Sequence, residues 1–532
     1  MKKHRKSYWS IKDLCTLLLA FSFFIPSTIC QFEINHVSEE ASNDLVLFCS
    51  LGDNNTYLIN KCGELINQWQ HEGTPGLSAM ITPDGNLLRA ERVLNGCCEQ
   101  PSAGGLLQLI DWDGNILWEY QDASNTTTQH HDFALMPNGH ILYTGWEAIP
   151  INSLFQYFTG FIWTEYVKEI RPIGSDSAEV IWEWHLKNHL IQDRIDIQYS
   201  DVSKEIGKVD IFYQGPFSFS SIDRWHINAI DYNPKTDQIL LNSRNTSEVW
   251  IIDHSTTTQE AAGNTGGNYN KGGQILFRWG NPEAHQRGTE SDIRMYGSHG
   301  TYWIKDHPEY EDYILYFNNW NIEQQSLSTI EMVKPSSPNS GEFELSQDST
   351  YTLDEHIIVY GGDQQAESLS SRYYSNAEIT PVGFLINEGQ TGHLFEINNQ
   401  NEIVWDATAL ERLTFKVHSY SPDYEGFTNH DLTPISSEHL ATQFEVCNPS
   451  TSVFDEPISG LNIFPNPVSD FLNIEIEYNG NARIYDSAMR LVIETKINKG
   501  SNSINCSTIE SGILFIQVES EGRTDLRKII KL

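Results

Sequence analysis

Three polar residues in the middle of the chain have the types and spacing to bind an anion and move a proton. His226 and Asn228 are separated by one residue, and Arg244 follows His226 by eighteen positions. Because side chains alternate between the faces of a strand, His226 and Asn228 are expected to share one face at the start of a strand. Arg244 ends the next apolar run, and its planar guanidinium suits a tetrahedral oxyanion. The alternative for Arg244 is a surface ion pair.

Two further histidine clusters lie on either side of this stretch. His130 and His131 precede Asp132, whose carboxylate could fix the tautomer of a neighbouring imidazole. His299 lies between Ser298 and a glycine, and glycines let the backbone approach a ligand closely. We expect the three clusters to converge on one polar pocket, in which a histidine attacks or transfers protons. Taken singly, each histidine is better explained as part of an exposed polar loop.

Short strands and turns must position these clusters. Pro-Asp-Gly at 83–85 and Pro-Asn-Gly at 137–139 are turn sequences, because Pro restricts φ and Gly accepts a positive φ. A second repeat is an apolar strand that ends in tryptophan, and it occurs at Trp69, Trp118, Trp182, Trp279 and Trp405. Repetition with long, irregular insertions predicts a β-propeller. We predict about six blades, one of them without tryptophan and ending near Tyr360, with the tryptophans packed between sheets. A pair of β-sandwiches is the alternative architecture.

The composition is that of a folded, acidic protein. The 532 residues carry a formal net charge of −37, and 39% are hydrophobic, 11% aromatic and 20% charged. This balance argues against disorder. The negative charge disfavours a nucleic acid partner, because it would repel the phosphate backbone. No oligomeric state follows from the sequence.

The first thirty residues are predicted to be a signal peptide. Lys2, Lys3, Arg5 and Lys6 precede a short apolar run over 14–26, and Cys30 ends an acceptable cleavage site. A membrane anchor is the alternative, but the run is shorter than the ~20 residues that a spanning helix needs. A lipid-modified Cys30 is disfavoured by the bulky Ile29. We therefore expect export.

Six cysteines remain after cleavage, and an exported protein can pair them. Cys49 and Cys62 flank a polar turn between two strand-like runs, which suggests a cross-strand disulfide. Neither a Cys-x-x-Cys pair nor a zinc-ligand spacing occurs, so we expect no metal. A metal site made of His130, His131, Asp132 and His226 lacks the close spacing of such motifs.

The chain is predicted to divide into four parts. These are the signal peptide (1–30), the β-propeller (31–446), a linker (447–460) and a small C-terminal β-sandwich (461–532). In the last part, Leu472, Ile474 and Ile476 alternate with polar residues, as in a half-buried strand.

This C-terminal part resembles the sorting domain of the type IX secretion system. The matching motifs are Ile463-Phe464-Pro465-Asn466-Pro467, Ile484-Tyr485-Asp486, Ser511-Gly512-Ile513-Leu514-Phe515-Ile516 and Lys528-Ile529-Ile530-Lys531-Leu532. The resemblance implies a partnership with that secretion machinery. Together with the signal peptide, it implies release from, or display on, a Gram-negative cell.

Residues from roughly 45 to 445 resemble the bacterial arylsulfate sulfotransferase family. The motifs that carry this resemblance, in order, are Gln129-His130-His131-Asp132, Trp182-Glu183-Trp184-His185, Trp225-His226-Ile227-Asn228, Ser243-Arg244-Asn245, Phe277-Arg278-Trp279-Gly280-Asn281-Pro282 and Gly297-Ser298-His299. Their ordered combination is much more specific than any one of them.

The resemblance implies an all-β, six-bladed propeller and a defined activity. Such enzymes move a sulfuryl group from an aryl sulfate to a phenol through a sulfohistidine, without a nucleotide sulfate donor or other cofactor. His299 matches the nucleophile, and His226, Asn228 and Arg244 match the sulfate-binding and acid–base residues. His131 matches the remaining histidine, with His130 as its substitute in substrate binding. The alternative function is a cell-surface propeller that binds glycans or proteins without turnover.

Overall fold

The computed structural model describes most of the chain after the signal segment. The described residues are 32–94, 96–98, 100–153, 160–193, 201–216, 222–321, 327–337, 339–348, 350–362, 369–411, 413–436, 441–447, 460–486, 490–509, 511–520 and 523–532. The predicted signal peptide and residues 448–459 of the predicted linker lie outside this set. In the described residues, no helix has the length and apolar character needed to cross a membrane.

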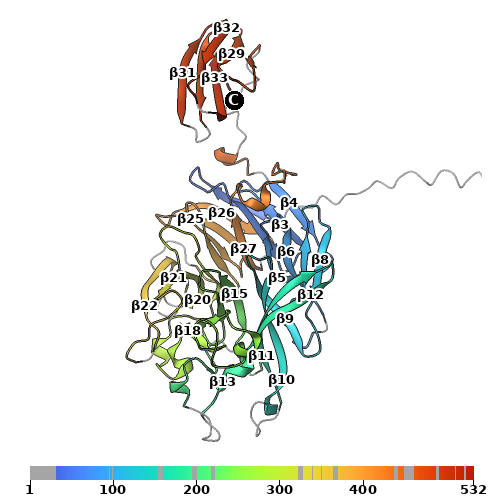
Figure 1. Cartoon of the computed structure of the whole chain (residues 1–532), viewed down its shortest axis with the longest axis vertical. Helices are drawn as coiled ribbons and strands as arrows, with labels where there is room; N and C mark the ends of the chain where they lie inside the picture. Colours follow the sequence, from blue (N-terminus) through green and yellow to red (C-terminus); the bar gives the residue numbers. More distant parts are fainter. Residues whose placement is uncertain are drawn as a thin grey trace, which may run out of the picture.

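Within the described residues up to 427, six antiparallel sheets have four or five strands each (Figure 1). The first contains β5 (Pro75–Ile81), β6 (Leu87–Arg92), β7 (Gly105–Ile110) and β8 (Ile116–Gln121). The second contains β9 (Thr127–Leu135), β10 (Ile141–Pro150), β11 (Phe161–Ile173) and β12 (Ser177–His185). The third contains β15 (Ile227–Asn233), β16 (Gln238–Ser243), β17 (Glu248–Asp253) and β18 (Ile275–Trp279).

The other three sheets include the strands nearest the two ends of this region. The fourth contains β19 (His299–Trp303), β20 (Ile314–Asn321), β21 (Leu327–Pro335) and β22 (Leu353–Gly361). The fifth contains β23 (Asn376–Ile379), β24 (Gly383–Glu388), β25 (His393–Asn398), β26 (Ile403–Ala409) and, at its edge, β1 (Phe32–Val37). The sixth contains β27 (Thr414–Tyr420), β2 (Leu45–Ser50), β3 (Asn55–Ile59) and β4 (Leu65–Gln70).

The remaining elements of this region are short. A parallel pair is formed by β13 (Leu190–Ile191) and β14 (Val209–Asp210). One helical turn, α1, covers Thr258–Ala261. The 3-10 turns are η2 (Ile151–Ser153), η3 (Leu186–His189), η4 (Val202–Lys204), η5 (Pro282–His285), η6 (Glu290–Asp292), η7 (Glu425–Phe427) and η8 (Glu445–Cys447).

One edge strand of each sheet faces the middle of the region. These strands contact one another in the order β5, β9, β15, β19, β23 and β27, and β27 contacts β5 in turn. The sixth sheet combines β27, from the end of the region, with β2–β4 from its beginning. The two ends of the region therefore meet in one sheet. The architecture is therefore all-β and propeller-like, as the sequence predicted.

The repeated tryptophans pack between neighbouring sheets. Trp69 and Trp118 lie in the outermost strands β4 and β8, Trp405 lies in β26 beside the edge strand β1, and all three are at most 3% exposed. Their indole N–H groups donate to carbonyl oxygens of the next sheet, at Asp111, Ser177 and Lys61 respectively, over 2.7–2.8 Å. Each tryptophan thus buries a large apolar surface and satisfies its one donor. The expected packing role is confirmed for these three tryptophans. Trp182 is buried as well, whereas Trp279 is only partly buried, and β22 carries no tryptophan, as expected for one blade.

The expected disulfide between Cys49 and Cys62 is wrong. Cys49 pairs in register with Thr56 of β3, so Cys62 lies well beyond its reach, and Cys49 is a buried free thiol. Cys62 instead bonds to Cys447, with a Cα–Cα distance of 5.3 Å. The bond ties the end of the propeller-like region to the turn before β4. Cys97 and Cys98 are bonded to each other.

The C-terminal part has two sheets around a core of its own. One sheet contains β28 (Asn462–Phe464), β29 (Phe471–Ile476) and β32 (Gly500–Asn505). The other contains β31 (Leu491–Ile497), β30 (Gly480–Tyr485), β33 (Gly512–Ser520) and β34 (Arg523–Lys531). Leu472, Ile474 and Ile476 are buried in the shared core, which confirms the alternation expected from the sequence.

Candidate active site

The sequence-predicted residues lie at one end of the propeller-like region, which we call the site end. His130 and His131 lie in β9, His226 directly precedes β15, and His299 begins β19. Arg244 directly follows β16, whose last residue pairs with Ile227. The innermost strands all start at this end, so the histidines come together although they are far apart in the sequence.

Backbone irregularities turn these side chains toward one another. The ladder between β9 and β10 is interrupted around His131, and the one between β15 and β16 at Asn228. A third irregularity follows His299 at the start of β19. His131 and His226 adopt left-handed conformations, with φ of 51° and 53°. Such conformations are costly for non-glycine residues, and they concentrate where function requires a particular side-chain direction.

His131 lies next to His226 and shares Phe415 with His299. Its ring centroid is 4.5 Å from that of His226, in an edge-to-face arrangement. His131 and His299 both lie against the ring of Phe415, at centroid distances of 5.8 and 6.4 Å. The three imidazoles therefore lie close together, two of them against Phe415.

His130 is hydrogen-bonded to His131 and lies behind it, against Trp146 and Glu165. The two Nδ1 atoms are 2.7 Å apart, so one of them donates to the other. On its other side, Nε2 of His130 is 2.8 Å from Glu165 Oε2, and the ring stacks on Trp146 at 3.8 Å. Glu165 Oε1 accepts the backbone N–H of Ile227. A fully buried carboxyl group thus connects the strand of His131 to the residue after His226.

The tautomer of His299 follows from its neighbour Asn319. The Asn319 amide group donates to the carbonyl oxygens of Ser371 and Tyr374, which are pure acceptors. Its oxygen must therefore face His299 Nδ1, 2.7 Å away. Because an amide oxygen only accepts, Nδ1 carries the proton. The lone pair of the neutral ring is then on Nε2.

Two of the imidazoles are kept neutral. Burial, followed by the positive charge of Arg244, holds the pKa of His299 well below its usual range. Burial also lowers the pKa of His131, and the charges of its histidine neighbours and Arg244 add to the effect. A neutral imidazole keeps its lone pair at pH 7, as a nucleophile requires.

Arg244 and His226 both interact with Asp223. Burial lowers the pKa of Arg244 to about 10, while the carboxylate of Asp223 acts in the opposite direction. The guanidinium therefore stays charged at neutral pH, and one of its nitrogens donates to Asn245. The Nδ1 atom of His226 donates to Asp223 Oδ2 over 2.5 Å. Asp223 can thus offset a positive charge that forms on His226 during proton transfer.

Asn228 is buried, and its side chain is hydrogen-bonded to two neighbouring residues. Its amide nitrogen donates to the carbonyl of Ser298, and its oxygen accepts from Asn242. The Ser298 hydroxyl donates to Asn242 in return. This network fixes the residue before His299, and it leaves one hydrogen of the Asn228 amide for another acceptor.

Asp132 does not orient either neighbouring histidine, contrary to the sequence-based hypothesis. Its carboxylate accepts from the Ser78 hydroxyl at 2.6 Å and the Lys416 ammonium at 2.7 Å. The orienting groups are Glu165, Asp223 and Asn319. Only Asp223, three residues before His226, has a local signal in the sequence; the other two come from distant strands.

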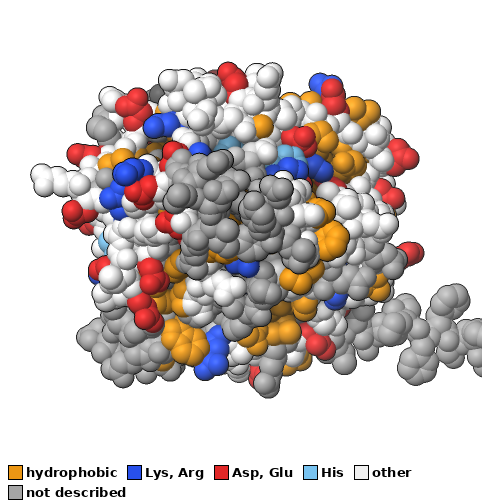
Figure 2. Space-filling model, turned by 90° about the horizontal axis from the view of Figure 1, so that it is seen from below, with side chains coloured by type: hydrophobic (Ala, Val, Ile, Leu, Met, Phe, Trp, Pro, Cys, Tyr) orange, Lys and Arg blue, Asp and Glu red, His pale blue; other side chains and the backbone are white. Residues whose placement is uncertain are grey.

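The loops of the site end expose large hydrophobic side chains. Leu94, Phe161, Ile222, Tyr373, Leu410 and Leu413 are between 38% and 66% exposed. Figure 2 shows this end, where hydrophobic side chains lie among basic and acidic ones. In the described residues, no group of three or more His, Cys, Asp or Glu has the arrangement of a metal site.

Comparison with solved structures gives only distant likenesses. The periplasmic gluconolactonase of Pseudomonas aeruginosa is 9% identical, with a TM-score of 0.36, and the match covers 71% of this chain and 99% of that one. A protein from Lactobacillus plantarum is 10% identical, with a TM-score of 0.34, over 87% of this chain and 100% of that one. These likenesses carry no argument about the present chain. No curated protein matches it.

Two family models match the sequence. Residues 462–532 match the secretion system C-terminal sorting domain, so the chain carries a tail for secretion to the cell surface or outside. Residues 84–408 match the arylsulfotransferase model and contain all the histidines described above, as well as Arg244. That match extends over more than half of the chain and supports sulfotransferase activity in general. The chain belongs to the arylsulfotransferase family.

Proposed function

We propose that the protein is a secreted aryl-sulfate sulfotransferase that works through a sulfohistidine at His299. The observation that carries the proposal is a neutral, buried imidazole whose Nδ1 proton is held by Asn319, next to a charged arginine. The six sheets would be the blades of a six-bladed β-propeller. The two C-terminal sheets would form a β-sandwich that the type IX secretion machinery recognises.

In the first step, Nε2 of His299 attacks the sulfur of an aryl sulfate. The bond from sulfur to nitrogen forms as the bond from sulfur to the aryl oxygen breaks, and the phenolate leaves. His226 supplies the proton that the leaving oxygen takes up, and Asp223 supports the charged form of this ring. His131, whose ring centroid is 4.5 Å from that of His226, is the second candidate for this proton transfer. General acid catalysis of this kind contributes typically 10²–10⁴-fold.

Arg244 and Asn228 would hold the oxygens of the sulfuryl group. The guanidinium places a positive charge next to oxygens that carry negative charge in the transition state. The second amide hydrogen of Asn228 adds a neutral donor, and His130 supports the pocket through His131. The exposed hydrophobic residues of the site end suit the ring of an aryl substrate.

In the second step, a phenol replaces the first product. His226, now without its proton, removes the proton of the phenol, and the phenol oxygen attacks the sulfur. The bond from sulfur to His299 breaks, and the neutral imidazole returns. The donor and acceptor thus react in turn at one site, so no cofactor is needed for either step.

The test is to incubate the purified protein with p-nitrophenyl sulfate, with and without phenol. We expect release of nitrophenolate that phenol accelerates, together with formation of phenyl sulfate. Saturable binding of p-nitrophenyl sulfate without release of nitrophenolate would contradict the proposal. That result would favour the alternative, a propeller that only binds its ligands.

A further inference from the structure

A cavity lies beside β18, the outer strand of the third sheet, and none of the three site histidines lines it. Its volume is about 400 Å³. Its wall includes Arg278, Trp279, His285, Arg287, Arg294 and Tyr351. These residues come from β18, from the segment between β18 and β19, and from the segment before β22. None of them belongs to the candidate active site.

Arg278, in the wall of this cavity, is held in an electrically neutral ion pair with Glu248. Arg278 donates through Nε and Nη2 to the two oxygens of Glu248, over 2.8 and 2.7 Å, and both side chains are fully buried. Its Nη1 donates to the carbonyl oxygens of Ile206 and Lys208. Burial would raise the pKa of Glu248, but Arg278 outweighs this effect and holds it near 2. Arg278 therefore supports the cavity but is not available to a ligand.

Two other groups in the wall have polar atoms without partners. No hydrogen bond from a described residue reaches the ring nitrogens of His285, which is 3% exposed, or the buried Nε of Arg287. The Nδ1 atom of His285 faces Glu248 Oε1 at 3.6 Å. Since a carboxylate only accepts, it favours the proton on Nδ1 and leaves the lone pair on Nε2. Unsatisfied buried groups are rare because each costs ~1–3 kcal/mol.

These groups restrict what can occupy the cavity. Nε2 of His285 requires a hydrogen-bond donor. Arg287 donates through Nη2 to the carbonyl oxygen of Ser203, and its Nε still requires an anion or another acceptor. The arginines disfavour a metal ion or an ammonium group at this nitrogen, so a neutral donor such as a hydroxyl group fits it best. Of the two acidic residues in the wall, Asp292 already accepts from the backbone and hydroxyl of Thr289, and Asp348 is exposed. The rings of Trp279 and Tyr351 provide flat surfaces against which a cyclic ligand can pack.

We propose that this cavity binds a hydroxylated ring that carries an acidic group. The acid pairs with Arg287, a ring hydroxyl donates to His285 Nε2, and the ring lies against Trp279 or Tyr351. Both saccharide acids and phenolic acids have this chemistry. The site is independent of the proposed sulfuryl transfer, because it shares no residue with the histidine cluster.

The test is calorimetric titration of the full secreted chain with D-glucuronate and, separately, with 4-hydroxybenzoate. An Arg244→Gln background removes the anion-binding arginine of the candidate active site. We expect saturable binding of at least one acid, and the stronger binder identifies the type of ring. Arg287→Gln should weaken it about 10- to 100-fold, because a charged hydrogen bond contributes ~1.5–3 kcal/mol. Arg287 is only partly buried, so its replacement spares the core.

Two comparisons make the test specific. His285→Phe should abolish the preference for 4-hydroxybenzoate over benzoate, because only the hydroxyl group uses Nε2. Arg171→Gln removes an exposed arginine of another sheet, paired with Glu179, and should leave binding unchanged. Absence of saturable binding to both acids would overturn the proposal. Equal binding by the parent and Arg287→Gln, or an equal loss in Arg171→Gln, would overturn it as well.

Discussion

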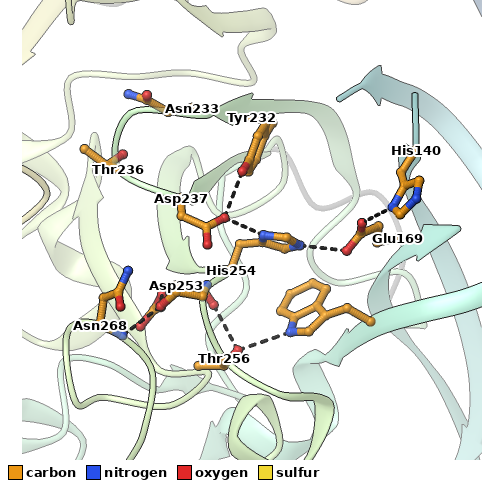
Figure 3. Close-up of polar contacts among 12 residues, drawn as sticks. His140, Glu169, Tyr232, Asn233, Thr236, Asp237, Asp253, His254, Thr256 and Asn268 are labelled. Atoms are coloured by element: carbon orange, nitrogen blue, oxygen red, sulfur yellow. Dashed lines mark hydrogen bonds and ion pairs between the residues drawn. The ribbon is translucent and has the colours of Figure 1, made fainter. Parts of the chain in front are cut away.

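The two ends of the propeller-like region use histidines in opposite ways. At the site end, His299 has an amide oxygen as its hydrogen-bond partner and a positive arginine nearby. At the other end, His254 lies between two carboxylates, with Nδ1 2.6 Å from Asp237 and Nε2 3.0 Å from Glu169 (Figure 3). Burial lowers the pKa of both rings. For His254, the hydrogen bonds to Asp237 and Glu169 outweigh burial and raise the pKa to about 9.

The difference shows that partners, and not burial alone, decide what a histidine does here. The imidazolium of His254 links Glu169 of the second sheet to Asp237 of the third, and Glu169 also bonds to His140 (Figure 3). Tyr232 donates to Asp237 and completes the network. Both nitrogens of His254 are engaged, so this ring is structural. In His299 the Nδ1 proton is held by Asn319, and the lone pair is on Nε2.

The largest expected effect is that of removing the His299 imidazole. His299→Ala should reduce transfer by on the order of 10³-fold or more, because the proposed nucleophile is absent. His254→Ala is the matched variant at the opposite end, and it should keep kcat near the parent value at temperatures where it is folded. Steady-state rates with p-nitrophenyl sulfate and phenol measure both. A comparable loss of transfer rate in the two variants would contradict the assignment of a catalytic role to His299 and a structural role to His254.

Replacing the charged group beside His299 should have the next largest effect. Arg244→Gln should lower kcat about 10²- to 10³-fold, as the loss of a transition-state donor typically does. Arg171→Gln, at an exposed position, is the control and should retain full activity. A change in KM alone in Arg244→Gln would mean that the arginine binds substrate and transition state equally.

The network around His254 should make stability depend on pH. Its folded pKa, about 9, exceeds its ordinary value of 6.5. Its contribution to stability is therefore complete below pH ~6.5 and is lost as the pH rises through about 9. His254→Gln should cost up to about 3 kcal/mol at pH 6 and much less at pH 10. Unfolding by denaturant at both pH values measures this, and a pH-independent cost would exclude an ionised His254.

The smallest expected effect concerns the tautomer of His299. Asn319→Leu removes the acceptor of the Nδ1 proton and should slow transfer about 10- to 100-fold, as the loss of an orienting partner does at other histidine sites. Asn319→Asp keeps an acceptor at the same place and should restore part of the rate. If the Asp and Leu variants are equally slow, Asn319 does not act through the Nδ1 proton.

The fold class was accessible from the sequence because it depends on local patterns, whereas the candidate site residues were assigned from the ordered set of motifs. The turns, the strands ending in tryptophan and the alternation around Leu472 are each recognised from residues that are neighbours in the sequence. Glu165 and Asn319 had no such signal, because each reaches its histidine across strands that are 20 or more positions apart. Cys447 was likewise assigned to the linker, since nothing near it indicates the distant Cys62. The function of Asp132 was misjudged because its partner Lys416 lies 284 residues away.

The most direct test of the account is to detect the covalent intermediate. The protein is mixed with p-nitrophenyl sulfate in the absence of phenol, digested, and its peptides are analysed by mass spectrometry. We predict one burst of nitrophenolate per protein molecule and a sulfuryl group on the peptide that contains His299. Neither should occur in His299→Ala, whereas His254→Ala should show both. Turnover without a labelled peptide, or a sulfuryl group on another residue, would contradict the assignment of His299 as the nucleophile.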